Sequence, residues 1–218
     1  MTRDELLRLF RLEVDDRAEP YFWSDEEFDI YLEDAQDVFV RAIRGIADRR
    51  SPLTKFQYKS GDQFKKYDER ILRIKGAFDE QNRILTVRNL DNLVSTQDDY
   101  GQRALVGLDD GTTGDIQILI TDVEANEIQL YPIPNHDGFV RMFVYRRPLS
   151  SELEIPSQHH LSLLSWVKYR AFSKHDVETF DEMKAAEFRT VFAEGVADAR
   201  REKSGREDTK RLMAYGGI

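Results

Sequence analysis

The sequence predicts an α+β protein: a helical bundle of about four helices formed from both chain ends, a central β-rich insertion and an extended C-terminal tail. Two observations favour this fold class. Apolar residues recur at helical spacing near both ends of the 218-residue chain,. Between these regions, glycines and prolines separate short runs rich in β-branched and aromatic residues,. We therefore assign residues 1–50 and 156–199 to the bundle, residues 51–155 to the insertion and residues 200–218 to the tail.

The N-terminal region contains two helix start signals. Thr2 stands three residues before Glu5, and Ser24 stands three residues before Glu27, which is the spacing of a capping box,. We expect a short first helix that ends before Pro20 and a longer second helix within residues 23–50. The apolar stripe of the second helix consists of Phe28, Leu32, Ala35, Val38, Phe39, Ala42, Ile43 and Ile46,.

The middle third predicts β structure. The expected strands cover residues 70–74, 83–87, 116–121, 127–131 and 139–146,. The turn sequence at residues 135–138 predicts that the last two strands form a hairpin,. Residues 91–114 are polar and weakly patterned, which indicates a long loop,.

Helical periodicity returns after Pro156. Residues 159–172 place Leu161, Leu164, Val167 and Ala171 on one helix face,. A tight connection then leads into a fourth helix, and we expect the two helices to form an antiparallel hairpin. The expected buried side of the fourth helix consists of Val177, Phe180, Met183, Phe188, Val191, Phe192 and Val196.

Charge is distributed unevenly along the chain. The formal net charge is -9, which argues against general electrostatic attraction to nucleic acid,. Residues 1–50 carry an excess of acidic side chains, whereas residues 200–218 carry an excess of basic ones. The tail also ends in apolar residues with no neighbouring element to bury them, so we expect it to fold on a partner.

The sequence offers little support for catalysis. Cysteine is absent, and the four histidines show no metal-ligand spacing,. No GxSxG, Walker A or GxGxxG pattern occurs,. We therefore predict a non-enzymatic protein without a cofactor or metal, although a hydrolase that uses two carboxyl groups of the insertion stays open. The sequence also shows no signal peptide and no membrane-spanning stretch.

Four segments together resemble a known family. They are the Trp-Ser-acid-acid helix start at residue 23, the PIPNHDG turn, the RRP sequence at residues 146–148 and the closing helix pair. In this order they are similar to the head-to-tail adaptor (connector) proteins of tailed bacteriophages. The resemblance implies a virion protein, assembled in the host cytoplasm, that forms a ring of about twelve copies under the portal at the head-tail junction. It also implies an extended DNA channel, through which packaged DNA passes without specific binding, and a platform for a nozzle, stopper or other tail component.

The resemblance also suggests three sets of contact residues. The portal-docking set lies in the tail and consists of Arg206, Lys210, Arg211, Leu212, Met213 and Tyr215. The ring-interface set pairs acidic and basic residues of neighbouring copies and consists of Glu26, Asp29, Glu33, Asp37, Arg41, Arg44 and Lys168,. The set for contact with a tail component consists of Asn126, His136 and Asp137.

Two alternatives from the sequence stay open. One is another ring protein of the phage neck or tail, which would share the symmetry but not the portal contact. The other is a regulatory protein that binds nucleic acid through the basic tail, since positive charge with an aromatic residue is the minimum for stacking on single strands.

Overall fold

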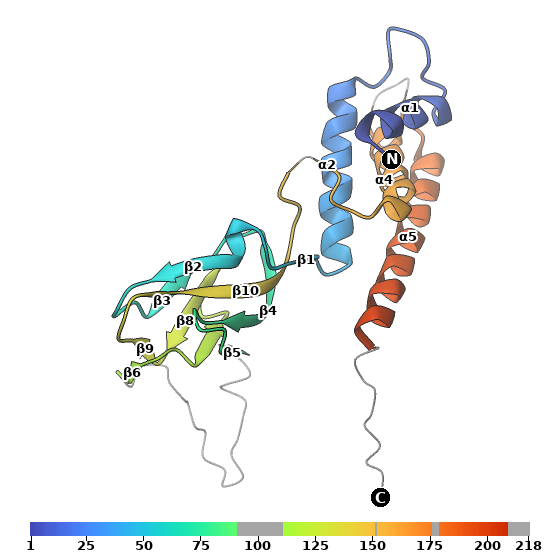
Figure 1. Ribbon diagram of the computed structural model, residues 1–218. Helices are drawn as coiled ribbons and strands as arrows, with labels where there is room; N and C mark the ends of the chain where they lie inside the picture. The colour runs from blue at the N-terminus through green and yellow to red at the C-terminus, as the bar shows by residue number, and fades with distance from the viewer. Residues whose placement is uncertain (91–110, 151, 176–178, 209–218) are drawn as a thin grey trace, which may run out of the picture. The chain divides into compact units, whose positions relative to one another are not determined.

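The computed structural model describes residues 1–90, 111–150, 152–175 and 179–208. The chain divides into two compact units, each with its own core (Figure 1). The helical unit comprises Met1–Arg44 and Pro148–Ile218, and the β unit comprises Gly45–Arg147. The chain therefore enters the β unit from one helix and returns to the helical unit afterwards.

Four α-helices form the described part of the helical unit. They are α1 (Arg3–Glu13), α2 (Asp25–Ala42), α4 (His160–Phe172) and α5 (Glu182–Asp208), and the short 3-10 helix η2 (Ser157–His159) precedes α4. Both predicted capping boxes are confirmed. Thr2 and Ser24 accept from the backbone N–H groups of Glu5 and Glu27, whose carboxylates accept in return from the capping backbones,.

Helices α4 and α5 pack side by side in opposite directions, as predicted. Gln158 before α4 contacts Glu202 late in α5, whereas Phe172 at the end of α4 stacks on Phe188 early in α5. Between these points, Gly195 lies directly against Ser162. The absence of a side chain on Gly195 therefore permits the close approach of the two helices.

Aromatic rings join the four helices into one core. Trp23, just before α2, packs edge-on against Phe10 of α1 and Phe172 of α4, with ring centroids 5.7 and 5.6 Å apart. Phe192 of α5 contacts both Phe39 of α2 and Trp166 of α4. Burial of these rings removes a large apolar area from water and thereby stabilises the helical unit.

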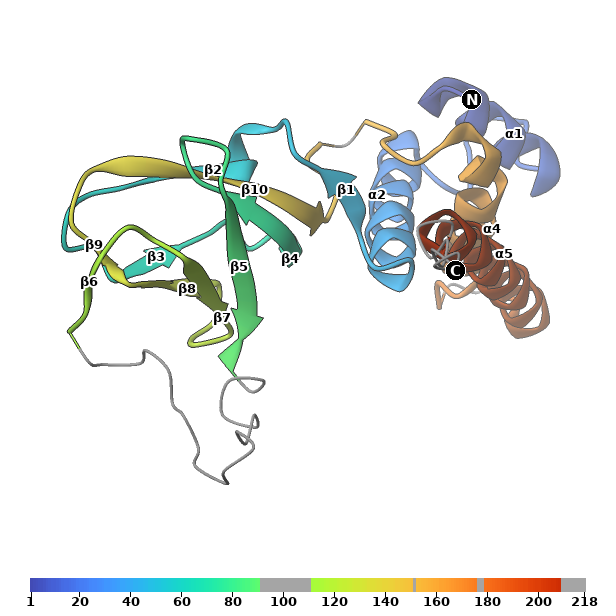
Figure 2. The ribbon, with the colours of Figure 1, turned by 60° about the horizontal axis from the view of Figure 1, so that its bottom comes forward.

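The β unit contains an eight-stranded curled sheet. Its strands are β1 (Ile46–Asp48), β2 (Lys55–Tyr58), β3 (Phe64–Lys66), β4 (Ile71–Phe78), β5 (Ile84–Asn89), β7 (Ile118–Thr121), β8 (Glu127–Tyr131) and β10 (Gly138–Arg146). The order is β1-β10-β4-β5-β7-β8-β3, and β2 also pairs with β10 (Figure 2). A separate pair of short strands consists of β6 (Thr113–Gly114) and β9 (Ile133–Pro134), and the 3-10 helix η1 (Pro52–Thr54) precedes β2.

The inner face of this sheet holds the core of the β unit. Val140, Met142 and Val144 alternate along β10 and are almost fully buried,. They pack with Ile74 and Ala77 of the neighbouring β4 and with other apolar residues of the core. The register of β10 against β4 shifts after Phe143 and after Tyr145, and such bulges bend a strand and increase its twist,.

The fold class expected from the sequence is wrong. The protein is a mixed α/β protein in which the sheet is a major body with its own core, rather than a helical bundle that carries a smaller β insertion. Strands β1, β2 and β3 were not predicted because each has only three or four residues, too few to show alternation,. They become strands by pairing with β10 and β8, which lie far away in sequence.

The second helix is shorter than predicted. It ends at Ala42, and Arg44 and Gly45 both adopt positive φ angles, 63° and 89°. This left-handed backbone stops the helix and directs the chain into β1. Ile46, which was predicted to continue the apolar stripe of the helix, instead pairs with Arg146 in the sheet.

The predicted hairpin between the strands at 127–131 and 139–146 is also wrong. Strand β8 pairs with β7 and β3, whereas β10 pairs with β1, β2 and β4. Pro132 and Pro134 interrupt the chain between them, and proline cannot donate to a ladder,. The intervening β9 pairs with β6 instead, so β10 crosses to a different part of the sheet.

The last helix differs from the prediction at its start, its buried face and its end. It begins at Glu182, while Val177 of the predicted stripe lies outside the described residues. Met183 is 86% exposed, and Phe180 and Val191 are also exposed, because Ala185, Phe192, Val196 and Ala199 form the stripe that packs against the other helices. The helix continues to Asp208, so residues 200–208 are not an extended tail.

Candidate functional site

The outer side of α2 presents an exposed apolar residue between two carboxylates. Ile30 is 54% exposed, and Glu26 and Glu33, four residues before it and three after it, are exposed as well. This spacing places the three side chains on one helix face, which we call the acidic α2 face. Within the described residues, Glu26 and Glu33 form no ion pair or side-chain hydrogen bond. Both charges are therefore available to a partner.

Three other residues of the predicted ring interface, Asp29, Asp37 and Arg41, already have partners inside the helical unit. Arg3 binds both carboxylate oxygens of Asp29, at 2.6 and 2.7 Å, and Arg41 pairs with Asp37 at 3.1 Å. Arg44 occupies the left-handed turn after α2.

Lys168, the last residue of the predicted ring interface, lies on α4 rather than on or beside α2. It is 8% exposed, forms an ion pair with Glu13 and lies over the ring of Phe188. A residue buried in this way stabilises its own subunit, and we do not retain it as a contact residue for a neighbouring copy.

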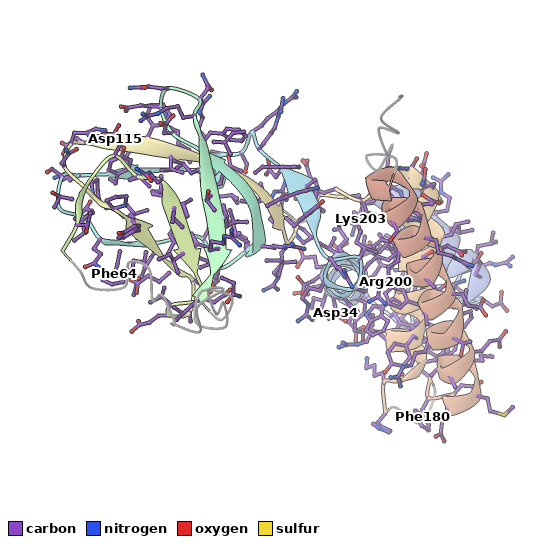
Figure 3. The ribbon with its side chains drawn as sticks, turned by 90° about the horizontal axis from the view of Figure 1, so that it is seen from below. Asp34, Phe64, Asp115, Phe180, Arg200 and Lys203 are labelled. Atoms are coloured by element: carbon purple, nitrogen blue, oxygen red, sulfur yellow. The ribbon has the colours of Figure 1, made fainter. Side chains whose placement is uncertain are left out.

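Two basic residues in the last part of α5 bind backbone carbonyl oxygens at the C-terminal end of α2. Arg200 donates to the carbonyl oxygen of Ala42 at 2.6 Å, and Lys203 donates to that of Ile43 at 2.8 Å (Figure 3). Cations at the C-terminus of a helix satisfy its last carbonyl groups and interact favourably with its dipole. This part of the predicted docking segment therefore has a structural role inside the helical unit.

The residues of the predicted portal-docking set lie further along the chain than Arg200 and Lys203. Arg206 has a 74% exposed side chain and a long ion pair of 3.7 Å with Glu202. The other members of the predicted docking set lie outside the described residues, and they are Lys210, Arg211, Leu212, Met213 and Tyr215.

The residues predicted to contact a tail component lie on two different loops of the β unit. His136 and Asp137 lie between β9 and β10, where Asp137 accepts from the backbone of Ser60 at 2.8 Å. Asn126 lies in the turn between β7 and β8, has a φ of 58° and accepts at its backbone carbonyl from Tyr67. The structure therefore brings two of the three residues together.

A polar network surrounds His136. Its ring nitrogens lie 3.8 Å from Glu80 and 3.8 Å from Asp115, and the hydroxyl of Tyr58 lies 3.5 Å away. Burial, followed by the nearby charge of Glu80, raises the pKa of Tyr58,. Because the two carboxylates face opposite nitrogens of the ring, they cannot share one metal ion with it. Across the described residues, no group of His, Asp and Glu has the arrangement of a metal site. The network fixes the loop before β10.

The outer side of β10 carries a surface that the sequence analysis missed. Along the strand, the exposed Arg141 and the half-buried Phe139 and Phe143 alternate with the buried core residues, and Tyr145, next in the alternation, is largely buried,. Neighbouring segments add Arg49, Lys55, Lys75 and Phe78 to the same side. We call these eight residues the cationic face.

Aromatic rings position the cations of this face. The ammonium group of Lys55 lies 3.9 Å from the ring centre of Phe139, and that of Lys75 lies 5.4 Å from both Phe143 and Tyr145,. Lys75 also donates to the hydroxyl of Tyr145 at 3.1 Å. Within the described part of the chain, none of the four cations forms an ion pair, so their charges face solvent.

The cationic face contains a hollow of about 500 Å³. The side chains of Phe78 and Phe143 line it from the outer face, and Arg49, Arg141 and Asn82 complete its wall. Arg141 is held in place because it donates to the side-chain oxygen of Asn82. The alternation along β10 was readable from the sequence. Lys55 and Lys75 join it only through strand pairing, and Arg49, which follows β1, joins it at the hollow.

A comparison with protein families identifies the chain. The profile of the SU10 adaptor protein family matches residues 1–214, nearly the whole sequence. The chain belongs to this family. The resemblance to phage head-to-tail adaptors seen in the sequence is thereby confirmed. No curated protein shows significant similarity to it.

Membership of the SU10 adaptor family makes the protein a phage adaptor, which is a structural component of the virion. The acidic α2 face and the cationic face are charged, exposed surfaces, one on each compact unit. No helix in the described ranges is long and apolar enough to cross a membrane.

Proposed function

We propose that this adaptor forms a ring of about twelve copies beneath the portal, extends the DNA channel and provides the attachment platform for tail components. The observation that carries the proposal is the family match over residues 1–214. The role is structural rather than catalytic. The portal binds one side of the ring, and a nozzle, stopper or other tail protein binds the opposite side.

The helical unit supports the assembly of copies into a ring. Closed rings form through heterologous contacts, in which one surface of a subunit meets a different surface of the next. The acidic α2 face leaves the charges of Glu26 and Glu33 without partners in the described residues, as a surface for such a contact requires. Opposite charges on the neighbouring surface would guide the two copies into register.

The C-terminal segment supports contact with the portal. Arg206 is exposed near the end of α5, and the residues that follow are basic and then apolar. We propose that Arg206, Lys210, Arg211, Leu212, Met213 and Tyr215 bind a groove of the portal protein. On the β unit, Asn126, His136 and Asp137 are proposed contacts for a tail component.

Pull-down of the portal protein tests the docking segment. The full chain, with an N-terminal tag, should retain the portal, and a truncation after Asp208 should lose it. This end point preserves Arg200 and Lys203, whose bonds to the end of α2 a shorter chain would lack. The truncated chain should keep the helical circular dichroism and the thermal unfolding midpoint of the full chain.

Two results would contradict the proposal. One is equal recovery of the portal by both chains, which would place the contact elsewhere. The other is recovery of nucleic acid alone by the full chain, lost at increased salt, which would favour a regulatory protein that binds nucleic acid. The stoichiometry of any portal complex, measured by native mass spectrometry, tests the ring of about twelve copies.

A further inference from the structure

We propose that the cationic face of the β unit in one copy binds the acidic α2 face of a second copy, with Ile30 inserted into the hollow beside Arg141. This inference rests on the proposed ring, because it names the two surfaces that join neighbouring copies. The contact is heterologous: each copy offers one surface to one neighbour and the other surface to the next.

The receiving surface combines an apolar floor with a cationic rim. Phe78 and Phe143 supply the apolar side chains of a hollow of about 500 Å³, which is ample for one aliphatic side chain,. Arg49 and Arg141 stand at its wall, and both are exposed. An arrangement of this kind fits an apolar side chain that has carboxylates on either side.

The acidic α2 face has this chemistry. More than half of the surface of Ile30 is exposed, and Glu26 and Glu33 flank it on the same side of the helix,. Docking of a helix face into an apolar groove is a recurring mode of recognition, and Ile30 is the anchor that the acidic α2 face offers,. Removing Ile30 from water favours the contact, and the carboxylates meet the guanidinium groups of the rim.

Nucleic acid fits the cationic face less well than a protein does. Lys55 and Lys75 lie over the rings of Phe139 and Phe143, so these cations occupy the ring faces on which bases would stack,. An apolar hollow also offers nothing to a phosphate backbone. A second copy supplies both the apolar side chain and the opposite charge, and the chain as a whole has a net charge of -9.

Site-directed crosslinking tests the contact directly, because the chain contains no cysteine. Two differently tagged full-length chains, one with Ile30→Cys and one with Arg49→Cys, are mixed at high concentration and treated with a short bismaleimide. The same mixture is treated in the presence of portal protein. We expect a crosslinked pair that carries both tags. Leu161→Cys is the matched control for Ile30→Cys, since Leu161 is similarly exposed, at 58%, but lies on α4.

Charge reversal provides an independent readout. The variants E26K/E33K and K55E/R141E should each lower the yield of crosslinked pairs at least about tenfold, since like charges then face one another,. Combining a chain that carries the first pair of changes with a chain that carries the second should restore the yield for the I30C–R49C contact. All changed residues are exposed, and circular dichroism verifies that each variant folds.

Failure of this inference is distinguishable from failure of the adaptor role. If the portal is bound but Ile30→Cys crosslinks no better than Leu161→Cys, the adaptor role stands and the contact is overturned. If the portal is not bound but the specific crosslink forms, the contact stands without the portal. Loss of duplex DNA binding in K55E/R141E with unchanged crosslinking would overturn the contact and assign the face to nucleic acid.

Discussion

Nε of Arg146 on β10 donates to the carboxylate of Asp48 on β1 at 2.5 Å, and the two side chains are only 9% and 8% exposed. The backbone N–H groups of Arg50 and Ser51 donate to the same carboxylate. Because Asp48 follows the point where the chain enters the β unit and Arg146 precedes the point where it leaves, this pair ties the ends of the unit together.

Asp48→Ala should destabilise the β unit by about 1–3 kcal/mol, because it removes a carboxylate that binds the buried guanidinium of Arg146, which keeps its bond to the carbonyl oxygen of Arg147,. The double variant Asp48→Ala with Arg146→Met should be more stable than the single one. Urea unfolding followed by far-UV circular dichroism measures both. Glu124→Ala, an exposed acid of the same unit, is the control and should unfold like the unchanged chain. Equal losses in the single and double variants would contradict the buried-charge explanation.

The β unit should lose stability on acidification. Burial would raise the pKa values of Asp48 and Asp79, but hydrogen bonds from their arginine partners and from backbone groups outweigh burial and lower both,. A carboxylate with a lowered pKa contributes stability above its unfolded value of about 4, and this contribution disappears as the pH falls through the folded value. Thermal unfolding midpoints should therefore decline below about pH 4, with a shallower decline in Asp48→Asn. Parallel pH profiles would refute the role of Asp48.

Gly195→Ala should loosen the packing of α5 on α4. An added Cβ would lie 2.7 Å from Cβ of Ser162, closer than non-bonded carbon atoms approach. We expect a loss of about 1–3 kcal/mol in stability, partly offset by the better helix propensity of alanine. Gly205→Ala in the same helix meets no atom within 4 Å and should be neutral or stabilising. The two tryptophans, Trp23 and Trp166, lie in the helical unit, so their fluorescence reports its unfolding.

Gly45→Ala should destabilise the β unit more than Gly61→Ala does. Both glycines have a positive φ, 89° and 86°, so alanine costs about 1 kcal/mol of backbone strain at either position,. Only at Gly45 would the new Cβ also lie 2.8 Å from Cβ of Tyr145, whereas nothing lies within 4 Å at Gly61. The difference between the unfolding free energies of Gly45→Ala and Gly61→Ala measures the cost of the clash with Tyr145. Identical values would show that backbone strain alone matters.

Asp34→Ala should weaken the contact between α2 and α4. The carboxylate accepts from the indole N–H of Trp166 at 2.7 Å and from Arg170 at 2.8 Å, and the loss of both bonds should cost about 1–2 kcal/mol (Figure 3),. Trp166 fluorescence should shift to longer wavelength as its ring becomes more solvated. Glu33→Ala, the exposed neighbour without such contacts, should leave both stability and fluorescence unchanged.

The sequence was sufficient where structure depends on neighbours along the chain. Spacing within one segment predicts the capping boxes at Thr2 and Ser24 and the stripe from Phe28 to Phe39. Two successive helical segments with a tight connection predict the hairpin of α4 and α5. The family was also readable, because the order of such local segments is a property of the sequence itself.

Only the tertiary structure decided which distant segments come together. The three-residue strands β1 and β3 have no stability of their own and exist through their ladders with β10 and β8,. The pairing of β2 with β10 places Lys55 beside Arg141, and pairing of this kind turns separate lysines and arginines into one cationic face. Local spacing encodes helices because their hydrogen bonds close within four residues, whereas a sheet and the surface built on it depend on contacts whose sequence separation carries no local signal.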